Sequence, residues 1–319
     1  MAKKNPKILS ASRIKTLENC SWLYWTNYNL KVPQRSNCGA MRGTLCHLIF
    51  ELLLKKRHLH HYKKILKYNN ITGSPAIDRL VRKHLKKDGI FDDGESYEMC
   101  NRMIIVGLQN DFFGEGGKID KPEVKFLLEN ENPEYKIMGY IDKPIQYAKD
   151  KKVKIVDYKS SKNKFRGEDL SCNVQAMAYT LASKKKLWPK LKNVFVEFLF
   201  LRFPKQPAQH IEVSKDQLSG FEYYLEHVYK IINNFTEKHA HSNFAKDGKN
   251  RWLCKAGKTW VCPYHDPFDY YALIDDEGET VKTAFKKKDL PEKENCKIEK
   301  MKYEGCPAQQ REIIDDFDF

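Results

Sequence analysis

The sequence lacks features that would place it in several large classes of protein. No apolar run approaches the roughly 18 residues that a membrane-spanning helix needs. The two longest runs, residues 48–54 and 194–201, are each interrupted by a glutamate. The first residues, MAKKNPKILSAS, contain no long apolar stretch of the secretory kind. The sequence therefore predicts a cytoplasmic protein, in the host-cell cytoplasm if the source is viral, with no membrane partner.

A nucleotide-hydrolysing motor is also missing. The segment AGKT at residues 256–259 looks like the end of a P-loop, but a P-loop needs a glycine five residues before its Gly-Lys pair. Trp252 occupies that position, and no apolar strand precedes it. The sequence thus predicts no nucleotide hydrolysis and no built-in helicase.

Positive charge is what the sequence has in excess. Lysine and arginine total 57 and aspartate and glutamate total 42 among 319 residues, so the net charge is +15. Such an excess favours a polyanionic partner, either nucleic acid or an anionic membrane surface. Basic segments such as 52–67 and 159–166 are suited to a phosphate backbone, whereas ordinary solvated surface explains only part of the total.

The pattern of apolar residues changes from helical to strand-like and back along the chain. The expected helices are 10–30, 42–54, one or more within 76–113, 171–188 with Ser171 as N-cap, and 214–239 with a capping box between Ser214 and Gln217. The expected strands are 123–129, 135–148, 153–159 and the almost wholly apolar 193–203. This order predicts an α/β fold, followed from residue 245 by a polar, weakly periodic region.

Two carboxylates and a lysine are predicted to meet on one patch. Residues two apart in a strand share a face, so Asp157 and Lys159 point the same way. If the second and third strands form a hairpin that turns at Lys149–Asp150, Asp142 falls directly opposite Asp157. Facing carboxylates repel each other unless a cation lies between them, and Mg²⁺ prefers such oxygens. The alternative is an ordinary surface Asp–Lys pair, because the D-x-K pattern is common.

Two helices add polar pairs one turn apart. His47 and Glu51 lie at i, i+4 on the helix 42–54, away from its apolar stripe, and Gln175 and Tyr179 repeat this spacing. Each pair alone is more often a half-packed helix face than a functional site.

Taken in order, four segments resemble the RecB-like branch of the PD-(D/E)XK nuclease superfamily over about residues 8–265. They are RGTLCHLIFE (42–51), GYID (139–142), IVDYKSS (155–161) and QAMAY (175–179). These are similar to the histidine helix, the G-x-x-D strand, the D-x-K strand and the Q-x-x-x-Y helix of that branch. The resemblance implies a restriction-endonuclease-like α/β core of helix, three strands, helix and strand, with a helical insertion at about 55–115.

The resemblance also implies a role for each matching residue. The ligands of Mg²⁺ or Mn²⁺ would be His47, Asp142, Asp157 and the carbonyl of Tyr158. The residues that act on the water and the phosphate would be Asp142, Asp157, Lys159, Gln175 and Tyr179. Glu51 would support the metal ligands, and Glu123 is a weaker candidate for contact with the metal or its water.

The activity expected from this resemblance is a divalent-metal-dependent deoxyribonuclease. It would be an exonuclease on single-stranded or frayed DNA ends in replication, recombination or repair. The alternative is a non-catalytic nucleic-acid-binding or assembly protein with a structural zinc site.

The nine cysteines favour ligation over disulfides in a chain without a secretory signal. Cys20 resembles the N-terminal cysteine of the iron–sulfur members of this branch, which include the CRISPR-adaptation and AddB-type nucleases. Those members add a C-x₂-C-x₅-C motif, from which Cys254 and Cys262 depart in spacing, so the fourth ligand would be His265, Cys296 or Cys306. The set suits a 4Fe–4S cluster or zinc, and unligated thiols are the alternative. The cysteines expected to be packing residues are Cys38, Cys46, Cys100 and Cys172.

The chain is expected to divide into three parts. Residues 1–245 would form the nuclease domain, and residues 246–310 would close a metal or cluster site with Cys20. Residues 311–319, REIIDDFDF, would form a mobile acidic tail. The tail is similar to the phenylalanine-terminated tails of bacterial and phage single-stranded-DNA-binding proteins, which dock on replication or repair partners. It could equally shield the DNA groove or merely keep the protein in solution.

Overall fold

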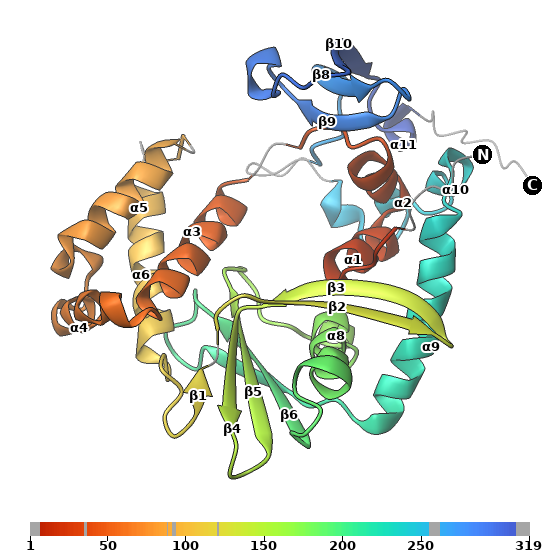
Figure 1. Cartoon of the computed structure of the whole chain (residues 1–319). Coiled ribbons are helices and arrows are strands. Elements are labelled where there is room, and N and C mark those ends of the chain that lie inside the picture. The colour runs from red at the N-terminus through yellow and green to blue at the C-terminus, as the bar shows by residue number, and fades with distance from the viewer. Residues whose placement is uncertain are drawn as a thin grey trace, which may run out of the picture. The chain divides into compact units, whose positions relative to one another are not determined.

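The computed structural model describes residues 7–34, 37–87, 89–90, 94–119, 121–254 and 262–310 (Figure 1). The chain forms two compact units, one built from residues 1–11 and 36–230 and the other from 12–35 and 231–319. These boundaries differ from the expected segments 1–245 and 246–310, whose functional division stays a prediction. The segment 256–259 and the acidic tail 311–319 lie outside the described residues.

The first unit contains a mixed five-stranded sheet, a separate hairpin and several helices. Its strands are β1 (Lys118–Ile119), β2 (Val124–Glu131), β3 (Glu134–Ile141), β4 (Lys143–Tyr147), β5 (Lys152–Lys159), β6 (Asn193–Phe200) and β7 (Ala208–Ile211). Its helices are α3 (Cys38–Leu53), α4 (Leu59–Tyr68), α5 (Pro75–Lys87), α6 (Glu95–Gln109), α7 (Glu168–Ser171), α8 (Val174–Ala182) and α9 (Lys215–Asn233), which runs on into the second unit.

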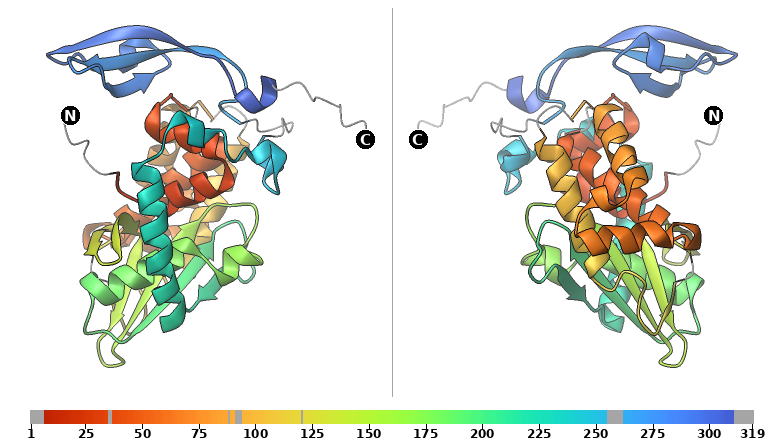
Figure 2. Two further views of the ribbon diagram at one scale, coloured as in Figure 1. Left: turned by 90° about the vertical axis from the view of Figure 1, so that its right-hand side faces the viewer. Right: turned by 90° about the vertical axis from the view of Figure 1, so that its left-hand side faces the viewer.

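The large sheet has the order β1-β4-β5-β6-β7, and only the β5–β6 pair is parallel. A parallel pair needs a crossover connection, and α7 and α8 supply it. Strands β2 and β3 pair with each other as a hairpin. Helix α9 runs beside α8 and this hairpin (Figures 1 and 2), where Glu222 accepts a 2.6 Å hydrogen bond from the Tyr135 hydroxyl.

The structure has the order of helices and strands that the sequence predicts, except that one predicted strand is two strands. The predicted strand 135–148 is two strands, β3 and β4, which separate at Asp142 and join different sheets. The predicted register is confirmed, because Lys143 pairs with Val156 and the next step brings Asp142 to Asp157. This division places Asp142 at a bend, where its side chain can turn toward β5.

The predicted helix starts are correct in one case and wrong in another. Ser214 and Gln217 form the expected capping box at α9, with hydrogen bonds of 2.9 and 3.1 Å. The helix predicted from Ser171 is interrupted, because α7 ends there and α8 begins after Asn173, whose side chain accepts from the Ala176 amide at 3.0 Å.

The second unit combines the helical residues near the N-terminus with a small sheet. Its helices are α1 (Ala11–Asn19), α2 (Ser21–Tyr24), a π-helical turn (Trp25–Asn29), α10 (Glu237–Ala240) and α11 (Pro307–Gln310). Its strands are β8 (Phe268–Asp275), β9 (Thr280–Ala284) and β10 (Cys296–Tyr303), in the order β10-β8-β9. The sequence did not predict this sheet, because β9 is short and β10 carries three exposed lysines among its eight residues. None of the described helices combines the length and apolar character that crossing a bilayer requires.

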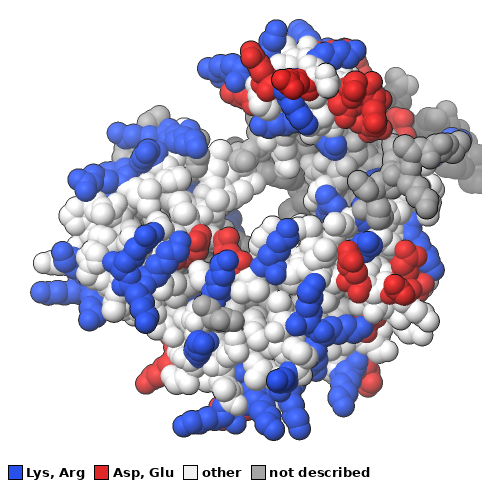
Figure 3. Space-filling model, in the orientation of Figure 1, with Lys and Arg blue, Asp and Glu red and all other residues white. Residues whose placement is uncertain are grey.

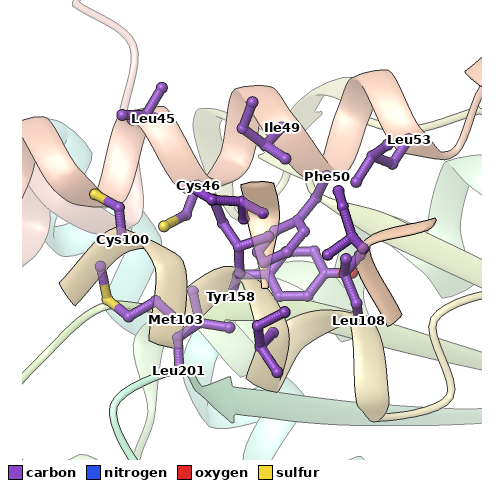
Figure 4. Packing of buried hydrophobic residues seen from close by; sticks show 14 of the residues in the cluster. Leu45, Cys46, Ile49, Phe50, Leu53, Cys100, Met103, Leu108, Tyr158 and Leu201 are labelled. Carbon is purple, nitrogen blue, oxygen red and sulfur yellow. The ribbon is translucent and has the colours of Figure 1, made fainter. Parts of the chain in front are cut away.

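A continuous apolar core joins α3 and α6 to the large sheet. Phe50 of α3 packs on the Tyr158 ring with centroids 4.3 Å apart, and Cys46 and Cys100 are buried nearby (Figure 4). The expectation of packing roles is therefore right for these two cysteines. It is wrong for Cys38 and Cys172, which are exposed.

Gly107 is what lets Phe50 enter this core, and its substitution tests the packing. A Cβ on Gly107 would lie 2.2 Å from the Phe50 ring. We expect Gly107→Ala to lower the free energy of unfolding by about 1–3 kcal/mol, because overpacking outweighs the helix propensity of alanine. Gly220→Ala in α9, which has open space at its Cβ, should instead stabilise the protein. Urea denaturation of both variants measures the difference, and a stabilising Gly107→Ala would contradict this account.

Candidate active site

The residues predicted to act on a phosphate are brought together at the carboxyl end of β5. The carboxylate of Asp157 is only 2% exposed, so it needs donors. Gln175 Nε2 donates to Asp157 Oδ1 at 2.8 Å, and the Tyr179 hydroxyl also lies 2.8 Å from that oxygen. Lys159 Nζ lies 2.6 Å from Asp157 Oδ2 and donates to Gln175 Oε1 at 2.7 Å. One turn of α8 therefore holds both Asp157 and Lys159 in fixed positions.

A second group of contacts joins α3 to the bend between β3 and β4. His47 Nε2 lies 3.1 Å from the Tyr158 carbonyl oxygen, and His47 Nδ1 lies 3.4 Å from Asp142 Oδ2. The same carboxylate oxygen accepts the Tyr158 amide at 2.9 Å. The predicted metal ligands His47, Asp142 and Tyr158 are thus neighbours in space. The fourth, Asp157, directly precedes Tyr158 in the sequence.

The balance of charge in the site depends on burial. Burial raises the pKa of Asp157, the Lys159 ammonium lowers it, and the charge of Asp142 raises it further. Burial on its own lowers the pKa of His47, but the hydrogen bond and charge of Asp142, with the charge of Asp157, outweigh it and raise the pKa to about 9. Without a metal, His47 is protonated at neutral pH. An imidazolium and an ammonium then balance two carboxylates.

The donor atoms are of a kind that fits a hard divalent ion. Asp157 Oδ2 is buried, and the group that balances its charge is the Lys159 ammonium, 2.6 Å away. Donors that share an octahedral ion lie roughly 3 Å apart, which matches the separation of His47 Nε2 from the Tyr158 carbonyl oxygen. Within the described ranges, no three His, Cys, Asp or Glu side chains already stand in ligating positions. The arrangement is one in which a cation would take the place of the His47 proton and share the two carboxylates with the Lys159 ammonium.

Glu51 and Glu123 line a pocket of about 530 Å³ beside His47. Glu51 forms a 2.9 Å ion pair with Lys55, so its charge is partly neutralised. The amide of Glu123 donates to the Asp142 carbonyl at 3.0 Å, and its φ of +53° is the left-handed conformation that most residues avoid. Both residues therefore line a pocket with His47, and their supporting roles stay predictions.

Sequence reasoning missed Gly43, which controls how closely α3 approaches β5. A Cβ on Gly43 would lie 2.6 Å from the Ser160 hydroxyl oxygen. The only signal in the sequence is a glycine one helical turn before His47. Its role could not be seen without the position of Ser160, which lies more than a hundred residues away.

In the second unit, four thiols lie close enough for the pKa values of three of them to be raised by neighbouring thiols. They are those of Cys20, Cys254, Cys262 and Cys306. Burial raises the pKa of Cys254 to about 11 and that of Cys262 to about 12, and the neighbouring thiols add to both. The other two candidates have different surroundings: His265 Nδ1 contacts Asp266 at 2.7 Å, and Cys296 pairs with Asp275 at the far end of β10.

Comparison with known proteins assigns the chain to a family. The profile of the PD-(D/E)XK nuclease superfamily matches residues 8–266. The chain belongs to this superfamily. It is therefore a nuclease, as expected, and the predicted fold class is confirmed. Nucleases of this superfamily generally use divalent ions such as Mg²⁺, and the family implies a DNA substrate.

Two further comparisons complete this result. No curated protein matches the nuclease significantly. A solved structure of a suspected exonuclease from Eubacterium rectale is similar at 12% sequence identity with a TM-score of 0.44. The match covers 78% of this chain and 93% of that one. Membership of the RecB-like branch stays a prediction.

Gly43→Ala tests whether the position of α3 controls activity. The added methyl group should push α3 from Ser160 and His47 from Asp142, and a displacement of 1 Å can lower the rate roughly a hundredfold. We expect a ten- to hundredfold fall in DNA cleavage. The double variant Gly43→Ala/Ser160→Ala should recover most activity, and Ser160→Ala alone should cleave almost normally. Full activity in Gly43→Ala would contradict this role.

Proposed function

We propose that the chain is a divalent-metal-dependent exonuclease that acts on single-stranded or frayed DNA ends in replication, recombination or repair. The observation that carries the proposal is the buried Asp157 carboxylate, with one oxygen held by Gln175 and Tyr179 of α8 and the other paired with the Lys159 ammonium at 2.6 Å. A protein that only binds DNA has no need of such an arrangement. This disfavours the alternative of a non-catalytic assembly protein.

The proposed metal ligands are His47, Asp142, Asp157 and the Tyr158 carbonyl. A bound Mg²⁺ or Mn²⁺ would lower the pKa of a water molecule and neutralise phosphate charge. Lys159, whose ammonium is held 2.7 Å from Gln175 Oε1, would orient that water and stabilise the charge that develops on the phosphate. Gln175 and Tyr179 would keep Asp157 and Lys159 aligned. Glu51 and Glu123 would support the ligands from the adjoining pocket.

The surface charge supports DNA as the substrate. Lysine and arginine predominate over the face of the first unit seen in Figure 3, whereas the sheet β8–β10 carries both signs. A basic face retains phosphates without regard to sequence. The preference for ends rests on the resemblance to the RecB-like branch. A role for the acidic tail in binding a replication or repair protein rests on its similarity to the tails of single-stranded-DNA-binding proteins.

The second unit is proposed to hold a 4Fe–4S cluster through Cys20, Cys254, Cys262 and Cys306. The mutual influence of these thiols supports Cys306 as the fourth ligand. Cys296 is a poorer candidate because it begins β10, whereas Cys306 follows the end of that strand. Tyr303 ends β10 seven residues after Cys296, about 23 Å away at 3.3 Å per residue. No three of the His, Cys, Asp or Glu side chains that the structure describes are already in ligating positions. Iron–sulfur is preferred to zinc because of the resemblance.

Asp157→Asn and Lys159→Met test the proposed chemistry. Each should lower cleavage of end-labelled DNA at least a hundredfold in Mg²⁺ or Mn²⁺, because each removes a charge at the phosphate. Lys190→Met, at the opposite end of the parallel strands, should change the rate less than about threefold and serves as the matched control. Linear single-stranded DNA should yield mononucleotides or short fragments, and a circular single strand should stay intact. Cleavage of the circle would refute the exonuclease assignment.

Cys306→Ser and Cys296→Ser test the cluster. Protein purified without oxygen should be brown and contain iron and sulfide, and Cys306→Ser should lose both while Cys296→Ser keeps them. Since the ligands join distant parts of the second unit, loss of the metal should also lower the melting temperature. A colourless protein with zinc would identify the other metal. Absence of both metals would remove the cluster.

A further inference from the structure

The outward face of the β2–β3 hairpin carries an aromatic ring that the proposed chemistry does not use. Tyr140 is 49% exposed, which is unusual for so large a side chain in a strand. Burial alternates along β3: Ile137 and Ile141 are buried, and Tyr140 is exposed between them. Tyr140 is two residues before Asp142, at the end of β3 that leads into the site.

The position of Tyr140 is tied to the active site through its backbone. Its carbonyl oxygen lies 2.8 Å from the Tyr179 hydroxyl, which lies at the same distance from Asp157 Oδ1. The inward face of the hairpin is also anchored, because Phe126 packs against the Tyr179 ring. The backbone that carries the Tyr140 ring is therefore joined to the Asp157 carboxylate through the Tyr179 hydroxyl.

An exposed lysine accompanies this ring. Lys125 is the direct cross-strand partner of Tyr140, so the two Cβ atoms lie about 5 Å apart on the same face. Its ammonium group has no ion-pair partner within the part of the chain that the structure describes. Lys136 further along the hairpin, by contrast, pairs with Glu129 at 3.4 Å. An aromatic face and a free positive charge thus lie side by side next to the proposed metal ligands.

We propose that Tyr140 and Lys125 bind the nucleotide that adjoins the scissile phosphate, on a single strand of DNA. The Tyr140 ring would stack on the base and the Lys125 ammonium would contact a phosphate. Stacking on an aromatic ring tolerates every base, which suits an enzyme that degrades DNA without regard to sequence. A base inside a duplex has both faces covered, so this contact also gives a physical reason for a preference for single-stranded or frayed ends. The inference rests on the proposed function.

Single abasic sites test the contact directly. Wild-type protein and variants are compared for binding of fluorescent single-stranded oligonucleotides in Ca²⁺, each with one abasic site at a different distance from the end. Wild type should show one position where loss of the base weakens binding about five- to a hundredfold. Tyr140→Ala should bind the intact strand weaker by the same factor and should not respond to the abasic site at that position. Tyr140→Phe should behave as wild type, since it keeps the ring.

Two further variants complete the design. Tyr223→Ala in α9 is the matched control, because Tyr223 is 63% exposed and its neighbour Glu222 bonds to Tyr135, near the opposite end of β3 from Tyr140. This variant should bind as wild type. Lys125→Gln should weaken binding and reduce the slope of log affinity against log salt by about one.

The outcomes separate this inference from the proposed function. If wild type cleaves DNA but Tyr140→Ala binds as tightly as wild type, or keeps the same sensitivity to the abasic site, the stacking contact is refuted and the nuclease assignment stands. If wild type fails to cleave DNA with Mg²⁺ or Mn²⁺, the proposed function itself is refuted.

Discussion

A carboxylate removed from water imposes a requirement on everything around it, and the Asp157 carboxylate imposes the strictest one in this protein. Its burial is tolerated because α8 presents a glutamine and a tyrosine to one oxygen and Lys159 lies at the other. Those contacts require the crossover between β5 and β6 to place one particular turn of α8 over the strand. The parallel strand pair, α8 and the charge balance are therefore interdependent, because the Asp157 carboxylate can be buried only when all three are in place.

The remaining ligand depends on packing rather than on charge. His47 reaches the Tyr158 carbonyl because α3 lies close against β5, and two glycines make this possible from opposite directions. Gly43 admits Ser160, and Gly107 of α6 admits the Phe50 ring that rests on Tyr158. Neither glycine has a side chain to offer a metal, yet both set the distance over which His47 acts. Apolar packing and metal chemistry thus share the same helix.

Much of the site could be predicted because its residues follow local rules. The turn at Lys149–Asp150 fixes the register that opposes Asp142 to Asp157, and helical spacing pairs Gln175 with Tyr179. The division of 135–148 at Asp142 could not be seen, because both halves are equally strand-like and only tertiary pairing separates them. The sheet β8–β10 was missed for a different reason: burial in β8 does not alternate, since Ala272, Leu273 and Ile274 are all buried, and three exposed lysines make β10 look like a solvated segment. Gly43 depends on a contact that no local pattern encodes.

The contacts that build the site join residues at very different separations along the chain. One half of the site is formed by β5 and α8, and the other by the contact of His47 with β5. The bond between Gln175 and Asp157 spans 18 residues, whereas the contact between His47 and the Tyr158 carbonyl spans 111. Closing the longer loop costs about 1.6 kcal/mol more chain entropy, before any ordering of the inserted helices α4 to α6. The strand–helix–strand half can therefore form early in folding, while the histidine half must wait until α3 docks on a finished sheet. A chain that has folded only its local contacts holds the lysine and its carboxylate but has no complete ligand set, so cutting ability is acquired last.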